Sequence, residues 1–125
     1  MRIGRLEIRP AGRKGLGVFA AEPIAAGETF DPQPVFELDL GDVPRIEATR
    51  FRHHYFAHPE LDGHGVVVLG WLTLVNHGVP PTLELDWRHD AAIGWVVLPR
   101  ARHDLAPGTE LTIDYNCPLW FEPVA

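Results

Sequence analysis

The chain has 125 residues, of which 46% are hydrophobic and 22% are charged, so its composition excludes a disordered protein and fits one globular domain. Its 17 acidic residues outnumber its 11 lysines and arginines, which gives a formal net charge of −6 at neutral pH. This balance argues against a general nucleic-acid binder and is compatible with either simple solubility or a basic partner.

The content of glycine, proline and cysteine further restricts the structural class of the protein. Twelve glycines and twelve prolines in this length favour short strands and many turns over long helices. Cys117 is the single cysteine, which excludes an internal disulfide bond and a zinc site built from several cysteines. Charges interrupt the apolar residues near the N-terminus, so neither a signal peptide nor a membrane-spanning segment is expected. We therefore expect a soluble, intracellular protein, cytoplasmic if it is bacterial.

The N-terminal part predicts a strand, a glycine-containing turn and a second strand. The first strand is indicated by an imperfect alternation of three apolar residues: Ile3, Leu6 and Ile8. Gly15 and Gly17 then flank Leu16, directly before the apolar segment 18–20. Glycines allow a backbone to approach a ligand closely, but an isolated Gly-x-Gly is more often a plain hairpin turn. A dinucleotide-binding fingerprint is not supported, because neither a third glycine nor a helical pattern follows.

Two further segments resemble each other. Residues 24–30 and 105–111 each place an apolar residue, one or two small residues and a glycine before a predicted strand. We interpret them as two similar turns that lead into strands, not as a domain repeat. Between residues 28 and 42 there are five acidic residues and no lysine or arginine. This acidic segment is either a solvated face or a rim that attracts a basic peptide.

The best helical candidate is the segment 43–58, in which Pro44 fits the first turn. Its apolar side chains lie roughly on one helical face: Ile46, Phe51 and Tyr55. Four histidines gather in or after this segment: His53, His54, His58 and His64. A metal site built from these histidines is an alternative, but their spacing matches no known zinc pattern. We therefore predict exposed or structural histidines and no bound metal.

The middle of the chain predicts buried or half-exposed strands separated by turns. The apolar patterns assign strands to three segments: 66–69, 83–87 and 93–98. The polar tripeptide 88–90 is predicted to be a turn, and Pro99 is predicted to end the last strand. The apolar run 71–75 leads into Asn76 and His77. These two side chains can aim hydrogen-bond donors and acceptors into a pocket, although a polar turn is the common alternative.

The C-terminal stretch carries the candidate catalytic side chain. Residues 107–108 are typical of a turn, and the alternation over 111–114 predicts a short strand. This strand delivers Tyr115, one of only two tyrosines, just before another turn signal at 116–118. On its own, a tyrosine that ends a strand is usually a packed aromatic residue. The tail is expected to dock onto the body of the domain through two adjacent aromatic residues: Trp120 and Phe121.

These elements add up to one mainly β domain with one or two short helices. Three stretches in it stand in an order and at separations that resemble the SET domain, the fold of many protein lysine methyltransferases. They are residues 14–20, the Asn76–His77 pair and residues 110–115. The likeness runs from about Arg5 to the tail, so it implies a single SET domain over residues 1–125 with a core at about 5–121. It also implies a β-clip-like fold of short strands in several small sheets, with a C-terminal pseudoknot.

The resemblance also implies roles for individual residues. The family binds S-adenosylmethionine on one side and a lysine on the other, and a narrow channel joins the two sites. The residues that would contact the cofactor are Lys14, Gly15, Leu16, Gly17, Asn76, His77 and Trp120. The catalytic role would fall to Tyr115. The walls of the substrate channel would be formed by Tyr55, Ile113 and Phe121.

The chain departs from the family pattern at several positions. After the Asn-His pair the family usually has Ser-Cys-x-Pro-Asn, whereas residues 78–82 of this chain are Gly-Val-Pro-Pro-Thr. Ile113 stands where the family often has Phe or Tyr, so the number of methyl groups added is open. With Cys117 alone, the cysteine-rich zinc segment of many eukaryotic members cannot form. Trp120 or Phe121 would have to supply the aromatic lid instead.

The resemblance therefore implies a protein lysine N-methyltransferase that uses S-adenosylmethionine and acts on a histone-like or other basic protein. Methyl transfer requires that donor and acceptor be aligned, and it needs no covalent nucleophile. An apolar channel and the nearby sulfonium would lower the pKa of the substrate lysine, and Tyr115 would orient the neutral amine. The alternative is a catalytically silent SET-like module that binds a peptide or partner. Direct binding of nucleic acid is not expected, and a homodimer is left open.

Overall fold

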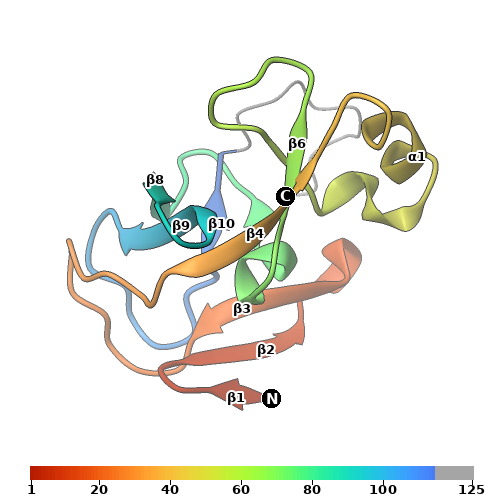
Figure 1. Ribbon diagram of the computed structural model, residues 1–125. Coiled ribbons are helices and arrows are strands. Elements are labelled where there is room, and N and C mark those ends of the chain that lie inside the picture. Colours follow the sequence, from red (N-terminus) through yellow and green to blue (C-terminus); the bar gives the residue numbers. More distant parts are fainter. Residues whose placement is uncertain (115–125) are drawn as a thin grey trace.

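Strands dominate the structure, a computed structural model that describes residues 1–114 (Figure 1). The strands form three sheets with the orders β1-β2-β3, β5-β6-β4-β9-β8 and β10-β7. The strands are β1 (Arg2–Ile3), β2 (Leu6–Pro10), β3 (Leu16–Ala20), β4 (Gln33–Leu38), β5 (Phe56–Ala57), β6 (Gly65–Val68), β7 (Asn76–His77), β8 (Leu83–Asp90), β9 (Gly94–Ala101) and β10 (Thr112–Ile113). The short helices are η1 (Gly12–Lys14), α1 (Val43–Glu47), η2 (Arg50–His53) and η3 (Trp71–Leu74). The predicted mainly β fold with several small sheets is confirmed.

The N-terminal sheet is a three-stranded antiparallel meander. β1 turns into β2 at Gly4, whose φ of +56° lies in the left-handed region that glycine adopts without strain. The prediction of one strand over the first eight residues is therefore wrong, because the chain reverses at Gly4. β2 pairs with β3 as far as Pro10 opposite Leu16. The glycine-containing stretch is thus a hairpin connection as well as a candidate ligand loop.

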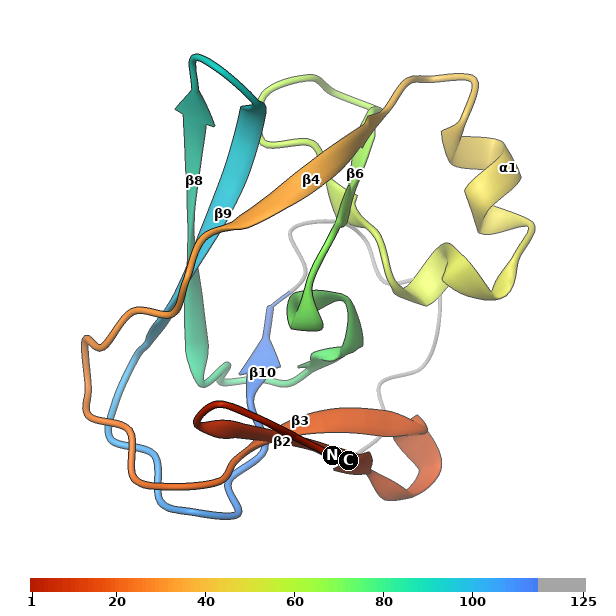
Figure 2. The same cartoon turned by 60° about the horizontal axis from the view of Figure 1, so that its bottom comes forward.

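The five-stranded sheet contains a long hairpin of β8 and β9 (Figure 2). Asp90 ends β8, and its Oδ1 atom accepts hydrogen bonds from the N–H groups of Ala92 and Ile93 at 2.8 and 3.1 Å. The turn therefore lies at residues 91–93. The prediction of a turn over 88–90 is wrong, because β8 continues through those residues.

Pro99 does not end β9, contrary to the prediction, and the strand continues to Ala101. Pro99 lies opposite Leu85, and its carbonyl oxygen accepts a hydrogen bond from the N–H of Phe30 at 2.9 Å. In an extended strand, the N–H and the C=O of one residue point to the same side. An N–H at position 99 would therefore point away from β8, as the carbonyl does. The β8–β9 ladder therefore loses no hydrogen bond at this position.

The helical segment is shorter than the prediction over 43–58, because α1 ends at Glu47. Thr49 interrupts the helix with extended backbone angles, φ −118° and ψ 175°. Its hydroxyl accepts a hydrogen bond from the N–H of Phe51 at 3.1 Å, which caps the separate 3₁₀ helix η2. Residues 56–57 then form β5. The cap that Thr49 forms therefore interrupts the helix that the apolar periodicity predicted over 43–58.

The two similar turn segments lie against each other. Ile24 and Leu105 form an antiparallel bridge in which each N–H donates to the carbonyl of the other, at 3.0 and 2.8 Å. Gly27 and Gly108 both have positive φ, of +83° and +88°. The N–H of Gly108 also donates to the carbonyl of Ala20 at 2.8 Å. The second turn thereby starts the C-terminal segment beside β3.

The hydrophobic core joins all three sheets. Its largest fully buried side chains are Ile24, Leu72, Leu83, Leu105, Leu111 and Ile113. Burial of a side chain of this size stabilises a fold by roughly 1.5–3 kcal/mol. The buried side chains of Leu111 and Ile113, on either side of Thr112, therefore anchor the segment that leads to Tyr115. Within residues 1–114, no helix has the length and apolar character needed to cross a lipid bilayer.

Candidate functional site

The C-terminal segment links the glycine-containing stretch to the Asn-His stretch. The N–H of Leu111 donates to the carbonyl of Val18 in β3 at 2.8 Å. One residue further on, β10 runs parallel to β7, with Thr112 beside Asn76 and Ile113 beside His77. The three stretches singled out in the sequence are therefore spatial neighbours. The parallel pairing is compatible with the expected pseudoknot, which stays a prediction because the tail lies outside the described residues.

Glu110 lies at the centre of these contacts. Its Oε1 atom accepts a hydrogen bond from the ammonium of Lys14 at 3.0 Å, and its Oε2 atom accepts one from Nδ2 of Asn76 at 2.8 Å. Both side chains of the ion pair are only 19% exposed, so solvent screens it less than a surface pair. A single carboxylate therefore ties the N-terminal loop to β7.

The side-chain amide of Asn76 is oriented by two acceptors. Besides Glu110, its Nδ2 atom donates to the backbone carbonyl of Leu16 at 3.1 Å. Since both neighbours are acceptors, the amide nitrogen must face them, and the carbonyl oxygen Oδ1 faces the other way. No donor in the part of the chain that the structure describes binds Oδ1. This oxygen can accept a hydrogen bond from a ligand.

Gly17 is the point of closest approach in the site. A Cβ atom there would lie 2.8 Å from Oε2 of Glu110, 2.9 Å from Cβ of Ala11 and 3.2 Å from Nδ2 of Asn76. At Gly15 a Cβ would meet open space, but the φ of +86° disfavours any other residue. Gly17 is therefore needed because the site has no space for a side chain, and Gly15 is needed for its backbone conformation.

The remaining predicted cofactor contacts differ in their surroundings. The His77 side chain is 9% exposed, and its Nδ1 atom lies 3.9 Å from Oδ1 of Asp114. Leu16 is 50% exposed, and its carbonyl is already bound to Asn76. Lys14 directs its charge toward a carboxylate of the protein itself. The roles of these residues toward a cofactor stay predictions.

The unusual run after His77 packs directly on β10. The N–H of Gly78 donates to the carbonyl of Ile113 at 3.0 Å, and a Cβ on Gly78 would lie 2.7 Å from Cβ of Thr112. The N–H of Thr82 donates to the Thr112 hydroxyl at 3.1 Å, and the Thr82 hydroxyl accepts from the Thr112 N–H at 2.8 Å. Glycine at this position therefore lets β7 and β10 approach closely.

Two of the three predicted channel residues lie within the described structure. Tyr55 is 5% exposed, and its hydroxyl donates to Oε1 of Glu47 at 2.7 Å. Ile113 is buried in the hydrophobic core. Their part in a substrate channel stays a prediction. Three predicted site residues lie outside the described residues: Tyr115, Trp120 and Phe121.

The histidines of the middle region show local contacts. The rings of His58 and His64 meet edge to face with centroids 6.1 Å apart. Burial, and then the neighbouring Arg52 and His54, lowers the pKa of His53. Among the described residues, no group of three or more His, Cys, Asp or Glu side chains could hold a metal ion. The alternative of a histidine metal site therefore has no geometric support in this part of the chain.

Sequence reasoning assigned no role to Glu110, although this residue begins the stretch 110–115. The strand alternation is the signal that could have identified it. Alternate residues of a strand face the same side, so Glu110 and Thr112 share the side opposite to Leu111. Thr112 lies beside Asn76, which places the carboxylate toward the amide.

We expect Glu110→Gln to destabilise the fold. Glutamine keeps the shape of the side chain but loses the charge that binds Lys14, so the free energy of unfolding should fall by about 1–3 kcal/mol. Glu84→Gln is the matched control, because the Glu84 side chain is 52% exposed and lies 3.7 Å from Arg100. Exposed pairs of this kind contribute roughly 0.2–1 kcal/mol. Urea unfolding measures both variants, and equally small losses would contradict the central role of Glu110.

Comparison with protein families and known proteins gives consistent matches. The model of the SET domain matches residues 15–116 of this chain. A histone-lysine N-methyltransferase of Schizosaccharomyces pombe, described as specific for lysine 37 of histone H3, is 30% identical over 120 residues. The aligned region covers 96% of this chain and 79% of the relative.

Solved structures show the same fold. A Plasmodium falciparum protein described as a histone methyltransferase superposes with a TM-score of 0.72 at 21% identity, covering 94% of this chain and 97% of that chain. An inhibitor-bound Polycomb Repressive Complex 2 of Chaetomium thermophilum superposes with a TM-score of 0.71 at 21% identity. That match covers 89% of this chain but only 15% of the larger one. At these identities the likeness shows the fold alone.

Proposed function

The chain belongs to the SET-domain family, and from this premise we propose that it is a protein lysine N-methyltransferase that uses S-adenosylmethionine. The observation that carries the proposal is the meeting of Gly17, Asn76 and Glu110 directly before the segment that leads into Tyr115. We further propose an intracellular protein whose SET domain spans residues 1–125, with its core at about 5–121. The family match over 15–116 supports this extent.

The groups around Glu110 fit a cofactor that carries an ammonium and a carboxylate. Oδ1 of Asn76 would accept a hydrogen bond from the ammonium, since both N–H bonds of that amide are used within the protein. Lys14 would contact the cofactor carboxylate by sharing its own ammonium with Glu110. Gly15, Leu16, His77 and Trp120 would complete the cofactor contacts. S-adenosylmethionine supplies the methyl group from a positively charged sulfonium.

In the proposed reaction the chain mainly aligns the two reactants. Holding donor and acceptor in a near-attack geometry can supply about 7–11 kcal/mol in favourable systems. Tyr115 would orient the lysine amine through its hydroxyl, and Tyr55, Ile113 and Phe121 would wall the channel. An apolar channel favours the neutral amine, which is the nucleophilic form, so the proton can pass to water.

The acidic segment 28–42 borders a groove that would accept a basic substrate. The groove has a volume of about 580 Å³, and its lining includes Phe36, Leu38, Ile46, Phe51 and Val67 together with Glu37, Asp42 and Arg45. Phe36 and Phe51 are 65% and 48% exposed. Exposed apolar patches with polar rims often mark interaction sites. A lysine-rich segment would find both apolar contacts and carboxylates in this groove.

We expect salt to weaken substrate binding. If carboxylates of the acidic segment attract a basic substrate, KM should rise as salt shortens the Debye length from about 10 Å at 0.1 M to about 3 Å at 1 M. The turnover number kcat should change much less, because the reacting atoms are aligned within the site. Steady-state kinetics with a basic peptide at several salt concentrations measures both constants. A KM independent of salt would contradict this role of the acidic segment.

The decisive test is transfer of a radiolabelled methyl group to a panel of basic proteins. Lys14 is the only lysine of the chain, so a Lys14→Arg variant separates self-methylation from methylation of the added proteins. Heat denaturation with and without S-adenosylmethionine tests the cofactor directly, since a ligand that binds the native state stabilises it. No transfer and no stabilisation would favour the silent peptide-binding module. Sedimentation of the same sample decides between monomer and homodimer.

A further inference from the structure

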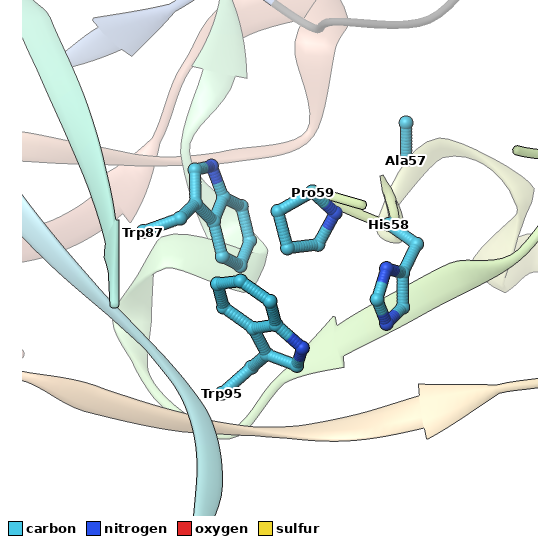
Figure 3. A pocket seen from close by; sticks show the side chains of 5 residues that line it. All are labelled: Ala57, His58, Pro59, Trp87 and Trp95. Carbon is cyan, nitrogen blue, oxygen red and sulfur yellow. The ribbon is translucent and has the colours of Figure 1, made fainter. Parts of the chain in front are cut away.

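A pocket outside the proposed methyl-transfer site is lined mainly by rings. Figure 3 shows the side chains of Trp87, Trp95, Pro59 and His58 around one space, with Ala57 at its edge. The pocket has a volume of about 320 Å³. None of these five lining residues belongs to the stretches that meet at the proposed cofactor site.

The register of the β8–β9 hairpin brings both indoles to one face. Trp87 lies opposite Val97, and Trp95 lies opposite His89. Residues two apart on a strand and directly paired residues share a face of the sheet, so all four side chains point to the same side. The Trp95 ring meets the rings of His58 and His89 edge to face, with centroids 6.0 and 5.2 Å apart. A rigid ladder, not a loop, therefore positions the aromatic walls.

One carboxylate, that of Glu37, lies beside this pocket and is bound to its lining residue His58. Nδ1 of His58 accepts hydrogen bonds from the N–H groups of Glu60 and Leu61 at 3.0 and 2.9 Å, so it carries no proton. The imidazole is therefore neutral, and its Nε2–H donates to Oε1 of Glu37 at 2.8 Å. The other oxygen of Glu37 lies 3.8 Å from where a Cβ of Gly94 would stand, next to Trp95. None of the five lining residues is a lysine or an arginine.

We propose that this pocket binds the methylated ammonium group of a lysine side chain in a partner protein. The faces of indole rings attract cations, and aromatic pockets are suited to quaternary ammonium groups. Ligand pockets usually measure roughly 300–1,000 Å³. A volume of about 320 Å³ therefore fits a small cationic group better than a nucleotide. The choice of methyllysine among quaternary ammonium compounds rests on the proposed function, whose product carries that group.

The test compares two basic peptides that differ only in one lysine, which is unmodified or trimethylated. Shifts of the indole N–H signals in nuclear magnetic resonance spectra report binding to the full chain. The trimethylated peptide is expected to bind about tenfold more tightly. Trp95→Leu removes the ring face but keeps an apolar side chain, and it should abolish this preference. Trp95→Phe should keep part of it, and Trp95 is chosen because Trp87 also packs against the hydrophobic core.

Equal binding of the two peptides, or a preference that survives in Trp95→Leu, would overturn the proposal. Tighter binding of choline or of a proline-rich peptide than of the trimethylated peptide would also overturn it. Methyl transfer by Trp95→Leu to a short unmodified peptide should match that of the unaltered chain. If the unaltered chain prefers the trimethylated peptide but transfers no methyl group, the proposed function fails while the pocket assignment stands.

Discussion

Replacement of Tyr115 by phenylalanine is expected to lower the rate of methyl transfer by about 10²–10³-fold with little change in cofactor binding. The hydroxyl would orient the lysine amine and the transferring methyl group, so its contribution is made at the transition state. The structure describes the chain up to the preceding residue, where Oδ1 of Asp114 lies 3.9 Å from Nδ1 of His77. Single-turnover transfer of labelled methyl groups measures the rate, and calorimetric titration measures cofactor affinity.

Tyr55, the only other tyrosine, provides the comparison for this experiment. Its hydroxyl donates to Oε1 of Glu47 at 2.7 Å, so Tyr55→Phe should lower the free energy of unfolding by about 0.5–1.5 kcal/mol. We expect its turnover to fall much less than that of Tyr115→Phe. Equal losses in the two variants, measured well below their unfolding temperatures, would remove the specific role assigned to Tyr115.

Motif order was enough to predict the fold, because each SET-like stretch is a local pattern. The glycines at 15 and 17, the Asn-His pair and the residues before Tyr115 can be recognised without knowledge of their partners. Their contacts could not be predicted in this way. The pairing of Ile24 with Leu105 and of β7 with β10 joins residues far apart in the sequence, and local periodicity contains no information about such partners.

Two of the wrong element boundaries, at Thr49 and at residues 88–90, share one physical cause. The Thr49 hydroxyl caps η2, and the Asp90 carboxylate accepts two N–H groups of the hairpin turn. Periodicity weighs apolar positions and gives no weight to polar side chains that bind the backbone. The error at residues 88–90 also concealed the pocket of Trp87 and Trp95. A turn at 88–90 would place Trp95 opposite Leu83, whereas the observed turn places it opposite His89, two residues from Trp87.

Glu110 was not predicted as a site residue, and the reason is different. A carboxylate beside an apolar strand is ordinarily solvated, and the alternation that places Glu110 on the same side as Thr112 does not reveal what that side faces. Its importance appears only when Lys14, Asn76 and Gly17 surround it. The sequence predicted Lys14 and Asn76 as site residues, and the structure adds that the carboxylate of Glu110 binds both.

Gly17→Ala is expected to have the second large effect, because the site has no space for a methyl group. The added Cβ would lie 2.8 Å from Oε2 of Glu110 and 2.9 Å from Cβ of Ala11. Overpacking of this kind costs about 1–3 kcal/mol of stability. Displacement of the carboxylate would also disturb Asn76, so cofactor affinity should fall by about tenfold or more, which is about 1.4 kcal/mol. Thermal unfolding and calorimetric titration measure the two effects.

Two further variants test whether the effects of Gly17→Ala arise from the close contacts at this position. Gly41→Ala is the matched control, because its Cβ would meet a single atom, Oδ1 of Asp39, at 3.3 Å, which is a looser contact than those at Gly17. Combining Ala11→Gly with Gly17→Ala removes one of the close contacts and should restore part of the stability but not the cofactor affinity. Recovery of both would assign the defect to crowding on Ala11 alone. If Gly17→Ala changes neither quantity, the loop and Glu110 can separate at little cost, and close packing at Gly17 no longer supports a cofactor site.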